Sequence, residues 1–103
     1  MTIFCYHFQT MNNLVTEIVG GESYTFQELS PNIVRAVGVC SERPTFKYTR
    51  IEIEGALDRL AAGETFEEIV DSYQGRVSRA AMSEALHLTL TQFLDSLPSL
   101  QIA

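Results

Sequence analysis

The chain has 103 residues, which is enough for one domain with a single hydrophobic core and too few for two. Its composition, 46% hydrophobic and 19% charged, is that of a globular protein and excludes wholesale disorder and fibrous repeats. Thirteen acidic and seven basic residues give a net charge of −6, so a uniformly cationic surface for sequence-blind nucleic-acid binding is excluded and any such contact has to be local.

Cysteine usage and hydropathy favour a cytoplasmic protein. Cys5 and Cys40 lie far apart and form no C-x-x-C pair, so the sequence contains neither a disulfide framework nor a zinc finger. No apolar run reaches the roughly 18–20 residues of a membrane span, and residues 1–16 lack the basic start of a targeting peptide. We expect reduced thiols and no contact with a membrane.

The first 44 residues are rich in Val, Ile, Phe, Tyr, Asn and Gly. Residues 3–8 alternate aromatic and smaller side chains, which is typical of a short strand. Residues 11–19 place apolar side chains on one helical stripe before a glycine, so we expect a short helix there, although their β-branched end also suits a strand. Residues 24–29 and 33–39 alternate on either side of a Ser-Pro-Asn turn and predict a hairpin.

Beyond residue 44, Ala, Leu and Glu recur at 3.6-residue spacing and predict three helices. Two T-x-x-E capping boxes begin at Thr49 and Thr65; in this motif the Thr hydroxyl accepts from the third amide and the Glu reaches back. Ser78 can cap the last helix. The first helix is expected to run to about residue 62, the second over 66–73 and the third over 79–97.

These elements predict a mainly α fold class: a three-helix, homeodomain-like helix-turn-helix domain preceded by a small β-hairpin segment. We divide the single domain, 1–103, into an N-terminal segment (1–44), a helix-turn-helix core (45–97) and a tail (98–103). The third helix is longer than the first two can cover, so several of its apolar side chains need a partner. These are Leu90, Phe93, Leu94 and Leu97. Either the hairpin or a second copy of the chain can cover them, and a homodimer is one expectation.

The stretch GVCSERPTFKYTRI, residues 38–51, resembles the signature of a bacterial family called domain of unknown function 433, in which a pattern close to G-x-P-x-x-K-x-T-R-I precedes a helical pair. The resemblance continues to about residue 90. It implies a homeodomain-like or winged helix-turn-helix fold like that of antitoxins, some of which pair with PIN-domain ribonuclease toxins. It also implies an entry loop, with Lys47 and Arg50, clamped to the first helix. Ser41-Glu42 stands where the family usually has a Gly pair, so either this loop takes another conformation or its glycines are not needed for positive φ.

Candidate DNA-binding residues lie in two places. Lys47 and Arg50 belong to the densest positive segment, where phosphate contact is one interpretation; the alternative pairs Arg50 with Glu54 and puts the nearby aromatic rings in the core. The start of the third helix, where recognition helices meet base edges, carries a predicted exposed stripe, with a solvated helix face as its alternative. This stripe consists of Arg76, Arg79, Ser83 and His87. Its neighbour Glu84 repels phosphate, although a carboxylate can accept from cytosine N4.

The sequence contains no catalytic or metal-binding motif such as G-x-S-x-G, a Walker loop or H-E-x-x-H. Cys5, His7, Cys40 and His87 can each bind a metal, but their spacing is not that of a ligand set. We therefore expect no enzyme activity, no metal and no cofactor.

Two functional hypotheses follow. The first is a small antitoxin-like helix-turn-helix protein that binds double-stranded DNA at its own promoter and regulates transcription. The second is a protein–protein interaction module that neutralises a PIN-domain ribonuclease toxin without binding DNA. Its contact would be an acidic surface made of Glu64, Glu67, Glu68 and Asp71.

Overall fold

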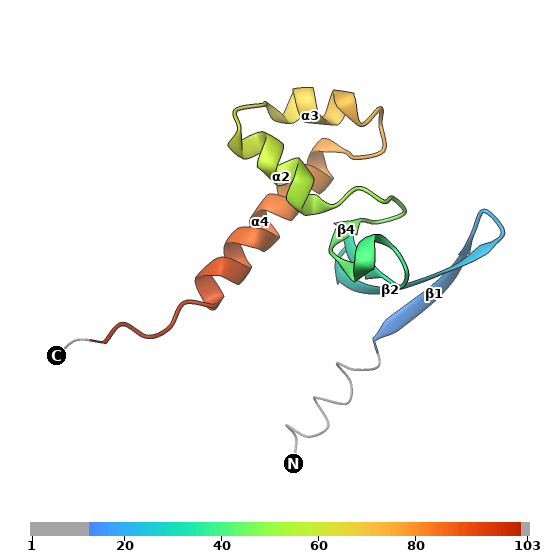
Figure 1. Ribbon diagram of the computed structural model, residues 1–103, viewed down its shortest axis with the longest axis horizontal. Coiled ribbons are helices and arrows are strands. Elements are labelled where there is room, and N and C mark those ends of the chain that lie inside the picture. Colours follow the sequence, from blue (N-terminus) through green and yellow to red (C-terminus); the bar gives the residue numbers. More distant parts are fainter. Residues whose placement is uncertain (1–12, 102–103) are drawn as a thin grey trace, which may run out of the picture.

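The computed structural model describes residues 13–101 and contains a four-stranded antiparallel sheet followed by three α-helices (Figure 1). The strands are β1 (Leu14–Val19), β2 (Glu22–Ser30), β3 (Ile33–Ala36) and β4 (Thr45–Phe46), in this order across the sheet. A one-turn element, η1 (Cys40–Glu42), precedes β4, and the helices are α2 (Ile53–Ala61), α3 (Phe66–Ser72) and α4 (Arg79–Asp95). The fold class is mixed α/β, which corrects the expectation of a mainly α domain. The strand predicted at residues 3–8 lies outside the described residues.

Residues 14–19 form strand β1, so the prediction of a short helix over 11–19 is wrong for its described part. Gly20 and Gly21 both have positive φ, 60° and 85°, and form a two-residue hairpin turn whose twist matches that of the flanking strands. The turn places Val19 opposite Glu22 in β2. Because this turn supplies a neighbouring strand, the β-branched residues of the segment adopt the extended conformation that they favour.

The hairpin predicted around the Ser-Pro-Asn turn is confirmed as β2 and β3. Ser30 pairs with Ile33, and the register shifts between Glu28 and Ser30. Strand β3 ends at Ala36, earlier than predicted, and pairs on its other side with β4. The second hairpin thereby brings the sheet beside the helical part of the chain.

The three predicted helices are present, but only one of the two capping boxes forms. Thr65 accepts from the backbone N–H of Glu68, and the Glu68 carboxylate accepts from the backbone N–H of Thr65. Ser78 caps α4 by accepting from Ala81. The Thr49 hydroxyl instead donates to the Phe46 carbonyl. Helix α2 therefore begins later than predicted, at Ile53.

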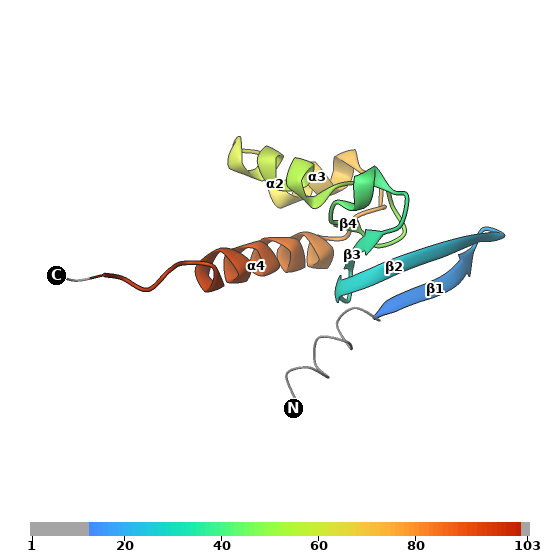
Figure 2. The same cartoon turned by 60° about the horizontal axis from the view of Figure 1, so that its bottom comes forward.

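A single core joins the sheet to the helices. Ile33 and Phe46 from the sheet pack with buried side chains of all three helices and of the α3–α4 turn. These helical and turn residues are Ala56, Ile69, Val77, Ala81, Met82 and Ala85. A second cluster contains Phe26, Val34 and Ala36. Figure 2 shows the helices grouped together and the β1–β2 hairpin extending away from them.

Element η1 contains Ser41 and Glu42, which stand where the family that the sequence resembles usually has a Gly pair. Its residues adopt positive φ although none of them is glycine. Cys40, Ser41 and Glu42 have φ values of 49°, 54° and 59°. Such left-handed conformations cost roughly 1–2 kcal/mol per non-glycine residue. The Glu42 carboxylate accepts from the Gly38 backbone N–H at 2.8 Å, and the Glu42 carbonyl accepts from Arg35 Nε at 2.9 Å. These bonds hold the loop in a conformation that its side chains disfavour.

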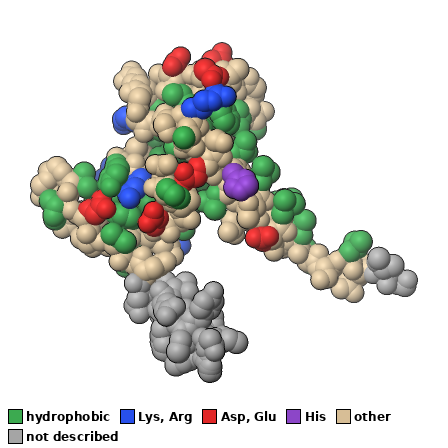
Figure 3. All heavy atoms as spheres, turned by 180° about the vertical axis from the view of Figure 1, so that it is seen from behind, with side chains coloured by type: hydrophobic (Ala, Val, Ile, Leu, Met, Phe, Trp, Pro, Cys, Tyr) green, Lys and Arg blue, Asp and Glu red, His purple; other side chains and the backbone are tan. Residues whose placement is uncertain are grey.

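The C-terminal half of α4 projects beyond the rest of the protein (Figures 1 and 2). The apolar side chains that the sequence left without a partner lie on this half of α4 or just beyond its end at Asp95, and they are between 52% and 61% exposed. They are Leu90, Phe93, Leu94 and Leu97. Within the described residues the hairpin of β2 and β3, one of the two partners considered, leaves them uncovered. Figure 3 shows hydrophobic side chains along this projecting part.

Candidate nucleic-acid interface

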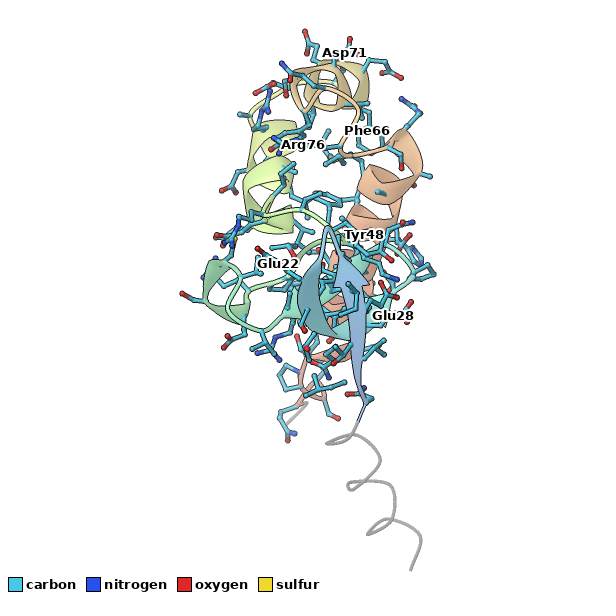
Figure 4. The ribbon with its side chains drawn as sticks, turned by 90° about the vertical axis from the view of Figure 1, so that its right-hand side faces the viewer. Glu22, Glu28, Tyr48, Phe66, Asp71 and Arg76 are labelled. Atoms are coloured by element: carbon cyan, nitrogen blue, oxygen red, sulfur yellow. The ribbon has the colours of Figure 1, made fainter. Side chains whose placement is uncertain are left out.

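Two predicted site residues that are distant in sequence line the same groove. The groove has a volume of about 440 Å³ and lies between the β1–β2 hairpin, the loops after β3 and β4 and the α3–α4 turn. Glu22 at the start of β2 also lines it. Arg50 comes from the loop after β4 and Arg76 from the turn, and both are exposed. Neither side chain forms an ion pair or hydrogen bond with another described residue. Figure 4 shows Arg76 and Tyr48 on the side of the molecule where the hairpin lies.

Two tyrosines hold the groove wall together. The Tyr24 hydroxyl accepts from the Tyr48 backbone N–H at 2.9 Å, and the Tyr48 hydroxyl donates to Glu17 at 2.8 Å. The hydrogen bond to Glu17 is the main reason why the pKa of Tyr48 lies above its ordinary value. These bonds join β1 and β2 to the loop that carries Arg50. They could not be predicted from the sequence, because they depend on β1 being a strand.

Lys47, a predicted phosphate contact, lies against the aromatic side chains of this wall. Its Nζ lies 4.9 Å from the centre of the Phe26 ring and 5.1 Å from that of Tyr48. Cations over aromatic faces are attracted by the ring quadrupole. Lys47 is half-buried, so its charge is less accessible than those of Arg50 and Arg76.

The predicted stripe at the start of α4 is exposed. Arg79, Ser83 and His87 follow one another at four-residue intervals and therefore share one helix face. Arg79 pairs with Glu67 and stacks on the Phe66 ring at 5.2 Å. An ion pair between two exposed side chains contributes little to stability and exchanges readily with another anion.

Glu84, the acidic neighbour of this stripe, is turned into the fold. Its carboxylate accepts from the Asn32 backbone N–H at 2.7 Å, from Asn32 Nδ2 at 2.9 Å and from the Ser30 hydroxyl. Partial burial pushes the pKa of Glu84 upward, but these hydrogen bonds outweigh it and lower the pKa below the ordinary value. Glu84 therefore fastens α4 to the β2–β3 turn.

The other arginines are engaged elsewhere. Arg43 pairs with Glu52 at 2.7 Å and with Glu54, so Glu54 does not serve as the partner considered for Arg50. Arg59 pairs with Glu64 at 2.7 Å, and this contact holds the pKa of Glu64 below its ordinary value. Three of the seven basic side chains, including Arg79, are thus already in ion pairs.

The candidate metal ligands of the sequence are its two cysteines and two histidines. Cys40 is a free thiol that donates to the Arg50 carbonyl at 3.3 Å, and His87 is exposed on α4. Among residues 13–101, no three His, Cys, Asp or Glu side chains gather as a metal-ligand set would. Cys5 and His7 lie outside the described residues. No helix in the described part of the chain is long and apolar enough to cross a membrane.

Comparison with known proteins places the chain in a family. The model of the family described as Protein of unknown function (DUF433) matches residues 33–88, more than half of the chain. The chain therefore belongs to the DUF433 family. No curated protein and no solved structure matches it. The matched segment begins at β3 and ends within α4, so it contains Arg50, Arg76 and the polar stripe but not strands β1 and β2.

Proposed function

We propose that the protein is a small antitoxin-like helix-turn-helix regulator that binds double-stranded DNA at its own promoter. In this proposal α3 and α4 form the helix-turn-helix unit and α4 is the recognition helix. The observation that carries the proposal is that Arg50 and Arg76 line one groove together with Glu22, both arginines being exposed and without an ion pair among the described residues. An acidic chain can bind a polyanion only through such a local concentration of free cations.

The groove and the helix stripe take different roles. Arg50 and Arg76 contact phosphates and fix the orientation of the protein on the duplex, whereas Lys47 supports the loop of Arg50 from the aromatic wall. Ser83 and His87 face base edges in the major groove. Arg79 exchanges Glu67 for a phosphate or a guanine.

The position of Glu84 supports this assignment. On the recognition helix of a DNA-binding protein, a free carboxylate beside the polar stripe would repel the phosphate backbone. Here its oxygens accept hydrogen bonds from Asn32 and Ser30. The Glu84 carboxylate is therefore bound to the β2–β3 turn and does not lie free beside the stripe of Arg79, Ser83 and His87.

A gel-shift or fluorescence-anisotropy titration with DNA from upstream of the gene, repeated at rising salt, tests the proposal. Arg50→Ala and Arg76→Ala should each weaken binding about tenfold at low salt and lower the slope of log affinity against log salt by about 1. Arg43→Ala is the matched control, because it removes the same charge from a side chain that already has carboxylate partners. Absence of binding at low salt, or an equal loss in the Arg43 variant, would refute the proposal.

The second candidate function is an interaction module that neutralises a PIN-domain ribonuclease toxin. It is favoured by the exposed acidic side chains of α3, Glu67, Glu68 and Asp71, which could face a basic RNA-cleaving partner. Co-purification with the product of a neighbouring PIN-domain gene tests it. Binding lost in Asp71→Lys but kept in Arg76→Ala supports the module, since only the first change alters the acidic surface.

A further inference from the structure

The groove that holds Arg50 and Arg76 also has an apolar part, which the proposed contacts with duplex phosphates leave unused. Val19, Val37 and Tyr48 line this part and are between 42% and 58% exposed. The groove volume of about 440 Å³ lies within the range of roughly 300–1,000 Å³ for small-molecule sites. Two cations and an aromatic side chain in one groove match a ligand that joins an anionic group to a flat ring.

The backbone of Tyr48 adopts a conformation that tyrosine disfavours. Its φ is 67°, in a turn that the Thr49 backbone N–H closes on the Phe46 carbonyl at 3.1 Å. Glycine or asparagine is favoured at such a position, and exceptions cluster at binding sites. Hydrogen bonds with Tyr24 and Glu17 hold the Tyr48 backbone and hydroxyl. The Tyr48 side chain is therefore positioned before a ligand arrives, which lowers the entropic cost of binding.

Glu22 gives the groove a third chemical feature. Figure 4 shows Glu22 beside the hairpin and Arg76 nearer the helices. The Glu22 side chain forms no ion pair or hydrogen bond with another described residue, and residues 1–12 contain no Lys or Arg. An ionised carboxylate only accepts hydrogen bonds, so a ligand beside Glu22 has to supply a donor. The amino groups of cytosine and adenine are such donors.

We infer that the groove binds one unpaired nucleotide whose base carries an amino group. Arg50 and Arg76 bind its phosphate. The base stacks on Tyr48, and its amino group donates to Glu22. The inference deepens the proposed function and rests on it for the two phosphate contacts. A base inside a duplex is already stacked and paired, so the ligand is a free nucleotide or an unpaired nucleotide of a single strand.

Isothermal titration calorimetry on the full chain, at pH 7 and low salt, tests the site with three probes. These are cytidine monophosphate, uridine monophosphate and inorganic phosphate. Cytidine monophosphate should bind about fivefold tighter than uridine monophosphate, which presents an oxygen to Glu22 where cytidine presents an amino group. It should bind at least about tenfold tighter than inorganic phosphate, which has no base to stack.

Two groove residues are tested by substitution. Glu22→Ala should abolish the preference for cytidine over uridine monophosphate. Glu28→Ala removes an exposed carboxylate from the same strand but outside the groove, so this matched control should keep the preference. Tyr48→Leu should weaken cytidine monophosphate at least about fivefold more than inorganic phosphate, whereas Tyr48→Phe, which keeps the ring, should not. Circular dichroism checks that each variant is folded.

The inference and the proposed function fail in different ways. Duplex binding without a preference among the three probes overturns the inference alone, and nucleotide binding without duplex binding overturns the proposed function alone. Unchanged probe affinities in Tyr48→Leu, or a preference that survives Glu22→Ala, would also overturn the inference. A six-residue oligocytidylate identifies the source of the ligand. Binding about tenfold tighter than that of cytidine monophosphate assigns the groove to a single strand, and equal affinity assigns it to a free nucleotide.

Discussion

Replacing Glu84 with glutamine should destabilise the fold, because a carboxylate that accepts three hydrogen bonds becomes an amide. One side of that amide is a donor facing the donors of Asn32 and Ser30. Hydrogen bonds to charged groups contribute about 1.5–3 kcal/mol when buried, but Asn32 is exposed and water replaces part of the loss. We therefore expect a loss of about 1–2 kcal/mol at pH 7, or a fall in Tm of about 5–15 °C for a domain of this size.

The effect should depend on pH in a defined direction. The pKa of Glu84 is lower in the folded chain than its ordinary value of 4.5. Its contribution is therefore complete above that value and disappears as the pH falls through the folded pKa. Thermal unfolding of the wild type and of Glu84→Gln should converge as the pH falls below 4.5 and through the lowered pKa of the folded state. Glu28→Gln, an exposed carboxylate on β2, is the control. Equal stability of both variants at pH 7, or a difference that persists at low pH, would refute the reasoning.

Three further substitutions test local features by urea unfolding. Thr45→Val should raise the free energy of unfolding by about 1 kcal/mol, because the buried Thr45 hydroxyl has no hydrogen-bond partner among the described residues; a loss would reveal a partner. Ser41→Gly should raise it by about 0.5–1 kcal/mol by relieving a left-handed residue, and an unchanged midpoint would argue against strain in η1. Gly21→Ala should lower it by about 1 kcal/mol, whereas Gly55→Ala within α2 should raise it; the same sign for both would contradict the assigned turn.

The helical half of the fold could be predicted from sequence because its signals are local. Thr65 and Glu68 lie one turn apart and cap α3 whatever the rest of the chain does. The same four-letter pattern at Thr49 failed because a non-local contact prevails there. Thr45 forms a bridge with Glu52, which holds Glu52 in an extended conformation directly before the first residue of α2. A capping box specifies a helix start only where no strand competes for the same residues.

Strand β1 could not be assigned from its own residues, because its apolar spacing fits both a helix and a strand. The decisive signal was the Gly-Gly pair that follows, which is typical of a two-residue hairpin turn when alternating runs flank it. The candidate site was predictable only in part for a related reason. Arg50 and Arg76 could each be selected by charge, but their common groove depends on how the α3–α4 turn approaches the β4–α2 loop. The partners of Glu84 lie in the β2–β3 turn, and Asn32 is 52 residues away in sequence, so the residues around Glu84 do not indicate them.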